Sequence, residues 1–92
     1  MAETARKTVY LKLEEGLHMR PCSMLQQVAG GFAGTATLQS GDRTADLKSI
    51  FDLLGMGLEN GSTAEVIAEG EGAGDFVAKL AAMFDNDFAP DD

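Results

Sequence analysis

One short stretch constrains the fold of this chain most, because it must convert an extended segment into a helix. It reads Gly16-Leu17-His18-Met19-Arg20-Pro21-Cys22-Ser23 and holds the only histidine and the only cysteine of the chain. Residues 8–13 before it alternate between apolar and polar side chains, which is typical of a half-buried strand. Proline is tolerated in the first helical turn, where its missing N–H would be unpaired, so the pattern predicts a helix that begins near Arg20.

His18 and Arg20 are the candidate functional residues of this stretch. A free imidazole has a pKa of about 6.5, so it is largely neutral and nucleophilic near pH 7. A helix start presents unpaired backbone N–H groups and partial positive charge, and arginine adds a fork that fits phosphate oxygens. The combination suits a site that accepts a phosphoryl group. A partly buried structural histidine is the alternative interpretation, and the residues alone favour it, because a lone histidine is more often structural.

Cys22 follows His18 by one helical turn. A thiol in a first turn can have a lowered pKa, and the alternative, which we favour, is a small buried side chain. One histidine and one cysteine supply only half of a zinc site, so the sequence predicts no metal site. A single cysteine also excludes an internal disulfide.

The next segments predict one helix, a hairpin and a second, short helix. Gly30-Gly31 ends the first helix, and Gly41-Asp42 supplies the two-residue turn between strands over residues 32–40 and 43–46. Ser49 and Asp52 have the spacing of a capping box before a helix over residues 50–54. The predicted apolar face of the first helix consists of Pro21, Met24, Leu25 and Val28.

The last third of the chain predicts a strand over residues 63–68 and a helix over residues 75–84. Between them, Gly70, Gly72 and Gly74 follow glutamates and lack the Lys-Ser/Thr of a phosphate-binding loop, so we expect a flexible loop. Residues 85–92 form an acidic tail. The element order strand, helix, strand, strand, helix, strand, helix predicts an α+β fold with helices on one face of an antiparallel sheet. The order alone leaves more than one layout open, a ferredoxin-like layout among them.

Composition limits the class of protein. Ninety-two residues suffice for a single domain over residues 1–92, with a core over about residues 7–84 and the tail beyond it. Fifteen acidic against seven basic residues give a net charge of -8, which argues against nucleic-acid binding. No apolar run suggests a signal peptide or a membrane span. We expect a cytoplasmic monomer that does not insert into membranes.

The residues Gly16, Leu17, His18, Arg20 and Pro21 resemble the active-site signature of HPr, the histidine-containing phosphocarrier of the bacterial phosphotransferase system. Residues 47–51 resemble the family's Lys-Ser-Ile/Leu segment, and residues 67–70 resemble its last strand and the following turn. The resemblance covers about residues 7–84. It implies the HPr layout, an open-faced β-sandwich of four antiparallel strands with three helices on one face, in the order βαββαβα.

The resemblance also implies a function in sugar uptake or its regulation. Enzyme I, charged from phosphoenolpyruvate, would pass a phosphoryl group to Nδ1 of His18, and His18 would pass it to an EIIA-type acceptor. Such a protein is a carrier and not an enzyme, and it needs no cofactor and no metal. Within that function, the helix start assigns phosphate binding to Met19 and Arg20. The apolar residues around the short second helix are too many for all of them to face the core, so we expect partner docking there and beside His18, at Met19, Ile50, Phe51 and Met56.

A second hypothesis is a regulatory binding protein with no transport role, modulated by an HPr kinase/phosphorylase at Ser49. The branch stays open, because Lys48-Ser49 resembles sugar-branch members whereas residues 82–88 and the acidic balance resemble the nitrogen-branch paralogue NPr. The first helix also has Gln26 and Gln27 where the family usually presents basic residues to Enzyme I. Asp52 stands where many members have lysine or glycine.

Overall fold

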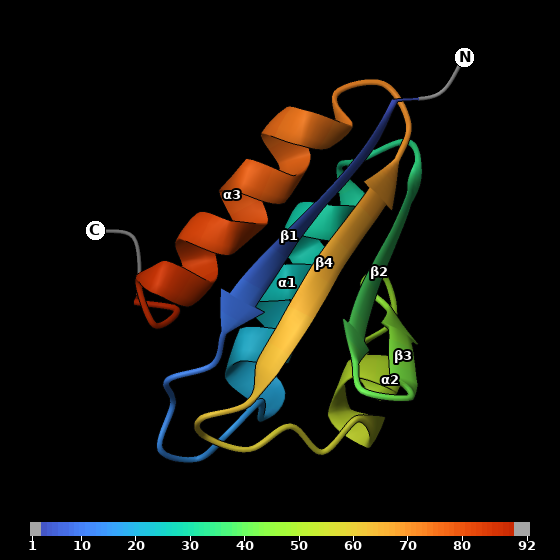
Figure 1. The fold of residues 1–92 in the computed structure, drawn as a ribbon. Coiled ribbons are helices and arrows are strands. Elements are labelled where there is room, and N and C mark those ends of the chain that lie inside the picture. The colour runs from blue at the N-terminus through green and yellow to red at the C-terminus, as the bar shows by residue number, and fades with distance from the viewer. Residues whose placement is uncertain (1–2, 90–92) are drawn as a thin grey trace.

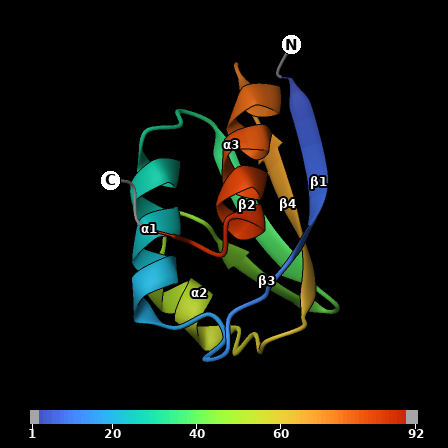
Figure 2. The same ribbon diagram turned by 90° about the vertical axis from the view of Figure 1, so that its left-hand side faces the viewer.

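The computed structural model describes residues 3–89, which form a four-stranded antiparallel sheet with three helices on one face (Figures 1 and 2). The elements are β1 (Thr4–Tyr10), α1 (Met19–Gly30), β2 (Thr35–Ser40), β3 (Arg43–Asp46), α2 (Ile50–Gly55), β4 (Thr63–Glu69) and α3 (Ala73–Asp85). The strands lie in the order β1-β4-β2-β3, so β1 and β3 are the edges of the sheet. The predicted fold class and the order βαββαβα are confirmed.

Side-chain alternation explains why the helices cover only one face. In β4, Ala64, Val66 and Ala68 are buried and Thr63 is exposed. In Figure 2 the helices lie on one side of the sheet, and α3 packs on β1 and β4 while α1 packs on α2. Each helix contributes one fully buried leucine, and burying such a side chain stabilises the fold by about 1.5–3 kcal/mol. These leucines are Leu25, Leu53 and Leu80.

The predicted hairpin is present. Ser40 pairs with Arg43, which leaves Gly41 and Asp42 as the two-residue turn. Gly41 has a φ of 62°, a conformation that glycine adopts without strain. The hairpin brings β3 to the edge of the sheet, from which the chain enters α2 (Figure 1).

The first strand lies earlier in the chain than the pattern predicts, because pairing and not hydrophobic alternation sets its limits. β1 pairs with β4 from Thr4 opposite Glu69 to Tyr10 opposite Thr63, where β4 begins. Leu11 is still buried and exchanges backbone hydrogen bonds with Ser62 and Gly61. The predicted strand over residues 8–13 was therefore wrong in its bounds, although its inward residues do reach the core.

The core extends past residue 84, which is its predicted end. After α3 the chain turns back, with φ of 52° at Asp87 and 56° at Phe88. The Phe88 ring is 1% exposed and meets Phe84 edge-on at a centroid distance of 4.8 Å. The burial of this aromatic side chain explains why an otherwise acidic segment packs on the domain. Residues 90–92 of the predicted tail lie outside the described part of the chain.

The start of α3 is closed by a carboxylate from the other end of the sequence. The Glu3 side chain accepts hydrogen bonds from the Gly74 amide at 2.8 Å and from the Gly72 amide at 3.3 Å. A carboxylate at a helix N-terminus also interacts favourably with the helix dipole. The segment expected as a flexible loop therefore contains a capped helix start at Ala73, two residues before the predicted one. No helix within residues 3–89 is long and apolar enough to span a membrane.

Candidate functional site

The loop that carries His18 is fixed to the segment after α2. The Leu17 amide donates to the Leu58 carbonyl over 2.9 Å, and the His18 amide donates to the Gly16 carbonyl over 3.0 Å. Gly16 has a φ of +72°, and a Cβ there would lie 2.5 Å from the Leu58 carbonyl oxygen. Both the backbone conformation and the lack of space therefore require glycine at this position.

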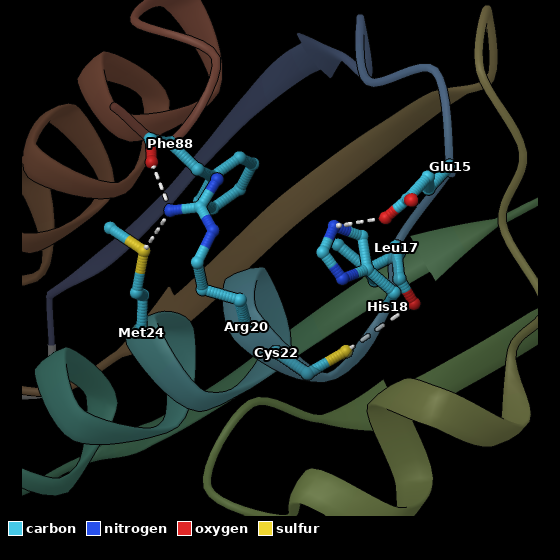
Figure 3. A network of polar contacts seen from close by, with 7 residues as sticks. All are labelled: Glu15, Leu17, His18, Arg20, Cys22, Met24 and Phe88. Atoms are coloured by element: carbon cyan, nitrogen blue, oxygen red, sulfur yellow. Dashed lines mark hydrogen bonds and ion pairs between the residues drawn. The ribbon is translucent and has the colours of Figure 1, made fainter. Parts of the chain in front are cut away.

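His18 is the N-cap residue of α1 and has an extended backbone, with no side-chain hydrogen bond to the helix. Its side chain is 36% exposed, and Nε2 lies 3.6 Å from Oε1 of Glu15. Figure 3 shows the ring with Nε2 toward Glu15 and the second nitrogen directed away from that carboxylate. The imidazole is therefore partly exposed, and its second nitrogen is not in contact with Glu15.

The first turn of α1 leaves the amides of Met19 and Arg20 without an acceptor among residues 3–89. Pro21 has no N–H, and the Cys22 amide already donates to the His18 carbonyl over 3.1 Å. Free amides at a helix start, with the positive end of the helix dipole, favour an anion. The two donors adjoin His18 in sequence, so they suit a negatively charged group on its ring.

Arg20 points away from His18. Its Nη1 donates to the Phe88 carbonyl over 2.6 Å and contacts Sδ of Met24 at 3.3 Å. In Figure 3 the guanidinium extends toward the segment after α3, whereas the His18 ring extends toward Glu15. The structure therefore does not bring the two predicted phosphate-site side chains together.

Cys22 lies in the core. Its side chain is 0% exposed, and burial raises the pKa of the thiol from 9.0 to about 11. The preferred interpretation, a small buried side chain, is therefore confirmed, and the lowered pKa is wrong. No group of three or more metal-ligating side chains occurs among the described residues.

The buried face of α1 differs from the predicted one, because Met24 and Val28 are only partly buried. The buried residues of this helix are Pro21, Cys22, Leu25 and Ala29.

Ser49 caps α2, as predicted, through its hydroxyl oxygen, which accepts from the Asp52 amide at 3.2 Å. The reciprocal half of the capping box is absent. The Ser49 amide donates instead to the Asp46 carbonyl at 2.9 Å, and the Asp52 carboxylate accepts from the Asp46 amide at 3.4 Å. The turn before α2 therefore already satisfies the donor that a capping box would use.

The four residues expected to dock partners differ in exposure. Met19 is 57% exposed and Phe51 is 84% exposed, whereas Ile50 is partly buried. Met56 is 2% exposed, so its assignment to a docking surface was wrong. Met56 follows α2 directly, and its long, flexible side chain fills space in the core below the helix.

Three residues around the site, Glu15, Phe88 and Leu58, were not predicted from the sequence. The spacing of Glu15, three residues before His18, could have indicated their contact. Phe88 is an isolated aromatic residue in an acidic segment, which could have indicated packing. Leu58 holds the His18 loop through a backbone carbonyl, and such a contact leaves no signal in the pattern of side chains.

Comparison with known proteins identifies the family. Residues 5–86 match the family model PTS-HPr, described as the PTS HPr component phosphorylation site. The phosphocarrier protein HPr of Vibrio cholerae is 35% identical over 79 residues, which cover 86% of this chain and 93% of that protein. A multiphosphoryl transfer protein of Xanthomonas campestris is 38% identical over 71 residues, or 77% of this chain, but these span only 8% of its length.

Solved structures support the same family assignment. A crystal structure of the phosphocarrier protein HPr from Bacillus anthracis superposes with a TM-score of 0.82 at 27% identity, over 88% of this chain and 96% of that one. The sequence match and the structural match both extend over most of the chain, and the predicted resemblance is confirmed. We conclude that this chain belongs to the HPr family of phosphocarrier proteins of the phosphotransferase system.

Proposed function

We propose that this protein accepts a phosphoryl group from Enzyme I, originating in phosphoenolpyruvate, on Nδ1 of His18 and passes it to an EIIA-type acceptor. The observation that carries the proposal is the position of His18, a partly exposed ring at a helix start with two free amides. Phosphoryl transfer requires positioning and charge stabilisation more than covalent assistance from the protein. The start of α1 offers both.

The residues of the site take the following roles. The lone pair of Nδ1 forms the new bond to phosphorus. At the same time the bond between phosphorus and the donor breaks, and the electron pair of that broken bond stays with the donor. The Met19 and Arg20 amides donate to the phosphoryl oxygens. Arg20 joins them when its guanidinium exchanges the Phe88 carbonyl for a charged oxygen, which is the stronger acceptor. Onward transfer to the acceptor reverses these steps.

Incubation with Enzyme I and phosphoenolpyruvate, followed by mass spectrometry, tests the proposal. We expect one added phosphoryl group that is acid-labile in the wild type and absent from His18→Ala. A thermal melt of His18→Ala shows whether that variant is folded. An acid-stable adduct, or labelling that survives in His18→Ala, would overturn the carrier function.

The second candidate is a regulatory protein controlled by phosphorylation of Ser49, with no transport role. The observation in its favour is that Ser49 is the N-cap residue of α2 and that Phe51, two residues further on, is exposed. A phosphate on Ser49 places negative charge beside this apolar side chain. ATP-dependent, acid-stable phosphorylation by an HPr kinase/phosphorylase, without phosphoenolpyruvate-dependent labelling, would favour this candidate over the carrier.

A further inference from the structure

A carboxylate lies against one nitrogen of the histidine ring. Oε1 of Glu15 is 3.6 Å from Nε2 of His18 (Figure 3). Among residues 3–89, no other carboxylate forms an ion pair with this ring. The distance exceeds that of a hydrogen bond, so the carboxylate acts on the ring through its charge. Arg20, the nearest cation in sequence, is bonded to Phe88 instead.

The charge of Glu15 distinguishes the two ring nitrogens. A neutral imidazole carries one proton, and the nitrogen without it has the lone pair that can attack an electrophile. A negative charge beside Nε2 favours the tautomer with N–H at that position, as a carboxylate does for metal-binding histidines. We propose that Glu15 is a positioning residue that holds the proton of His18 on Nε2 and leaves Nδ1 as the attacking nitrogen. This inference rests on the proposed carrier function.

The same carboxylate assists both directions of transfer. When Nδ1 forms its bond to phosphorus and the donor bond breaks, the Nε2 proton stays in place and the ring becomes positively charged. Glu15 pairs with that charge. When the phosphoryl group leaves, the electron pair of the N–P bond returns to Nδ1 and the ring is neutral again. Neither step therefore requires a proton to enter or leave the site.

The chain offers a sharp test, because His18 is its only histidine and its ring signals in ¹⁵N NMR are unambiguous. Spectra recorded above neutral pH report which ring nitrogen carries the proton. We expect Glu15→Gln to lower the ratio of the Nε2–H to the Nδ1–H tautomer by about two- to five-fold, since exposed ion pairs are weak. Glu15→Asp keeps the negative charge, so its tautomer ratio should lie between those of the wild type and Glu15→Gln.

Glu14→Gln is the matched control, because Glu14 is an adjacent exposed carboxylate whose removal changes the net charge equally. It should leave the tautomer ratio at the wild-type value. A ratio in Glu15→Gln that equals those of the wild type and Glu14→Gln would overturn the inference. This measurement needs no phosphoryl donor, so it decides the role of Glu15 even if the carrier function fails.

Transfer kinetics provide the second measurement. With Enzyme I and phosphoenolpyruvate, Glu15→Gln should lower the maximal rate of His18 phosphorylation by about two- to five-fold, the scale of an exposed ion pair, with little change in KM. Glu14→Gln should match the wild type in both. A change in KM alone would show that Glu15 contacts the partner and does not orient the ring, which contradicts the inference. A wild type that takes up no phosphoryl group would instead overturn the proposed function.

Discussion

The guanidinium of Arg20 donates a 2.6 Å hydrogen bond to the carbonyl of Phe88 and thereby joins the start of α1 to the turn after α3. The donor is charged, and such hydrogen bonds are about twice as strong as neutral ones. The Phe88 ring is anchored in the core against Phe84. The position of the Arg20 side chain, for which we propose a role in phosphate binding, is therefore set by the packing of an aromatic residue late in the chain.

Removal of Arg20 tests its proposed movement to the phosphoryl group. We expect Arg20→Ala to slow transfer from Enzyme I by roughly ten-fold or more, because a hydrogen bond to a charged group contributes about 1.5–3 kcal/mol. Arg6→Ala is the matched control, since Arg6 pairs with Glu65 on the sheet at 3.2 Å and carries the same charge. Equal transfer rates in the two variants would show that Arg20 makes no phosphate contact.

Gly16→Ala tests the support of the His18 loop. The substitution forces a left-handed conformation on alanine and brings its Cβ to 2.5 Å from the Leu58 oxygen. We expect the free energy of unfolding in urea to fall by about 1–3 kcal/mol and transfer to slow. Gly30→Ala is the control, because a Cβ there meets no atom within 4 Å. Equal stability of the two variants would contradict the importance of this contact.

Substitutions of Ser49 test whether its role as a helix cap can be separated from an effect on partner docking. Ser49→Ala should lower the free energy of unfolding by about 1 kcal/mol through loss of the cap, whereas Ser49→Thr keeps a capping hydroxyl and should lose less. Ser49→Asp should melt near the wild-type temperature, because aspartate also caps helices, but should impair transfer by placing charge beside Phe51. Full transfer activity of Ser49→Asp would leave Ser49 as a helix cap only.

The burial of Cys22 should lower the free energy of unfolding at alkaline pH. Burial raises the pKa of the folded thiol to about 11 from 9.0, so the unfolded chain loses this proton first as the pH rises. The contribution of Cys22 to the free energy of unfolding is therefore complete below pH 9.0 and is lost as the pH rises toward about 11. Urea titrations of the wild type and Cys22→Ala across this window should differ in slope. Parallel pH dependences would contradict the prediction.

Local signals made much of the fold predictable from the sequence. Period-two alternation placed β4, the Gly41-Asp42 pair placed the hairpin turn, and Gly30 with Gly31 ended α1. These features depend on residues that are neighbours in sequence, and their physical causes act over a few residues. The motif around His18 was visible for the same reason.

Long-range contacts made other features unpredictable. The limits of β1 depend on where β4 begins, and the burial of Phe88 depends on the space beside Phe84. Met56 is apolar and follows a short helix, so the pattern alone did not distinguish a core position from a surface one. The direction of Arg20 depends on a carbonyl 68 residues away. Each of these outcomes requires knowledge of what lies opposite in space.

The bond between Glu3 and the start of α3 has a consequence for the order of folding. Glu3 and the Gly74 amide are separated by 71 residues, so their contact closes a loop of most of the chain. Loop-closure entropy makes such distant contacts slow to form, whereas the β2–β3 hairpin closes over a two-residue turn. We infer that β1 joins a preformed β4-β2-β3 sheet late. Its amides should then be among the first of the sheet to exchange with solvent deuterium.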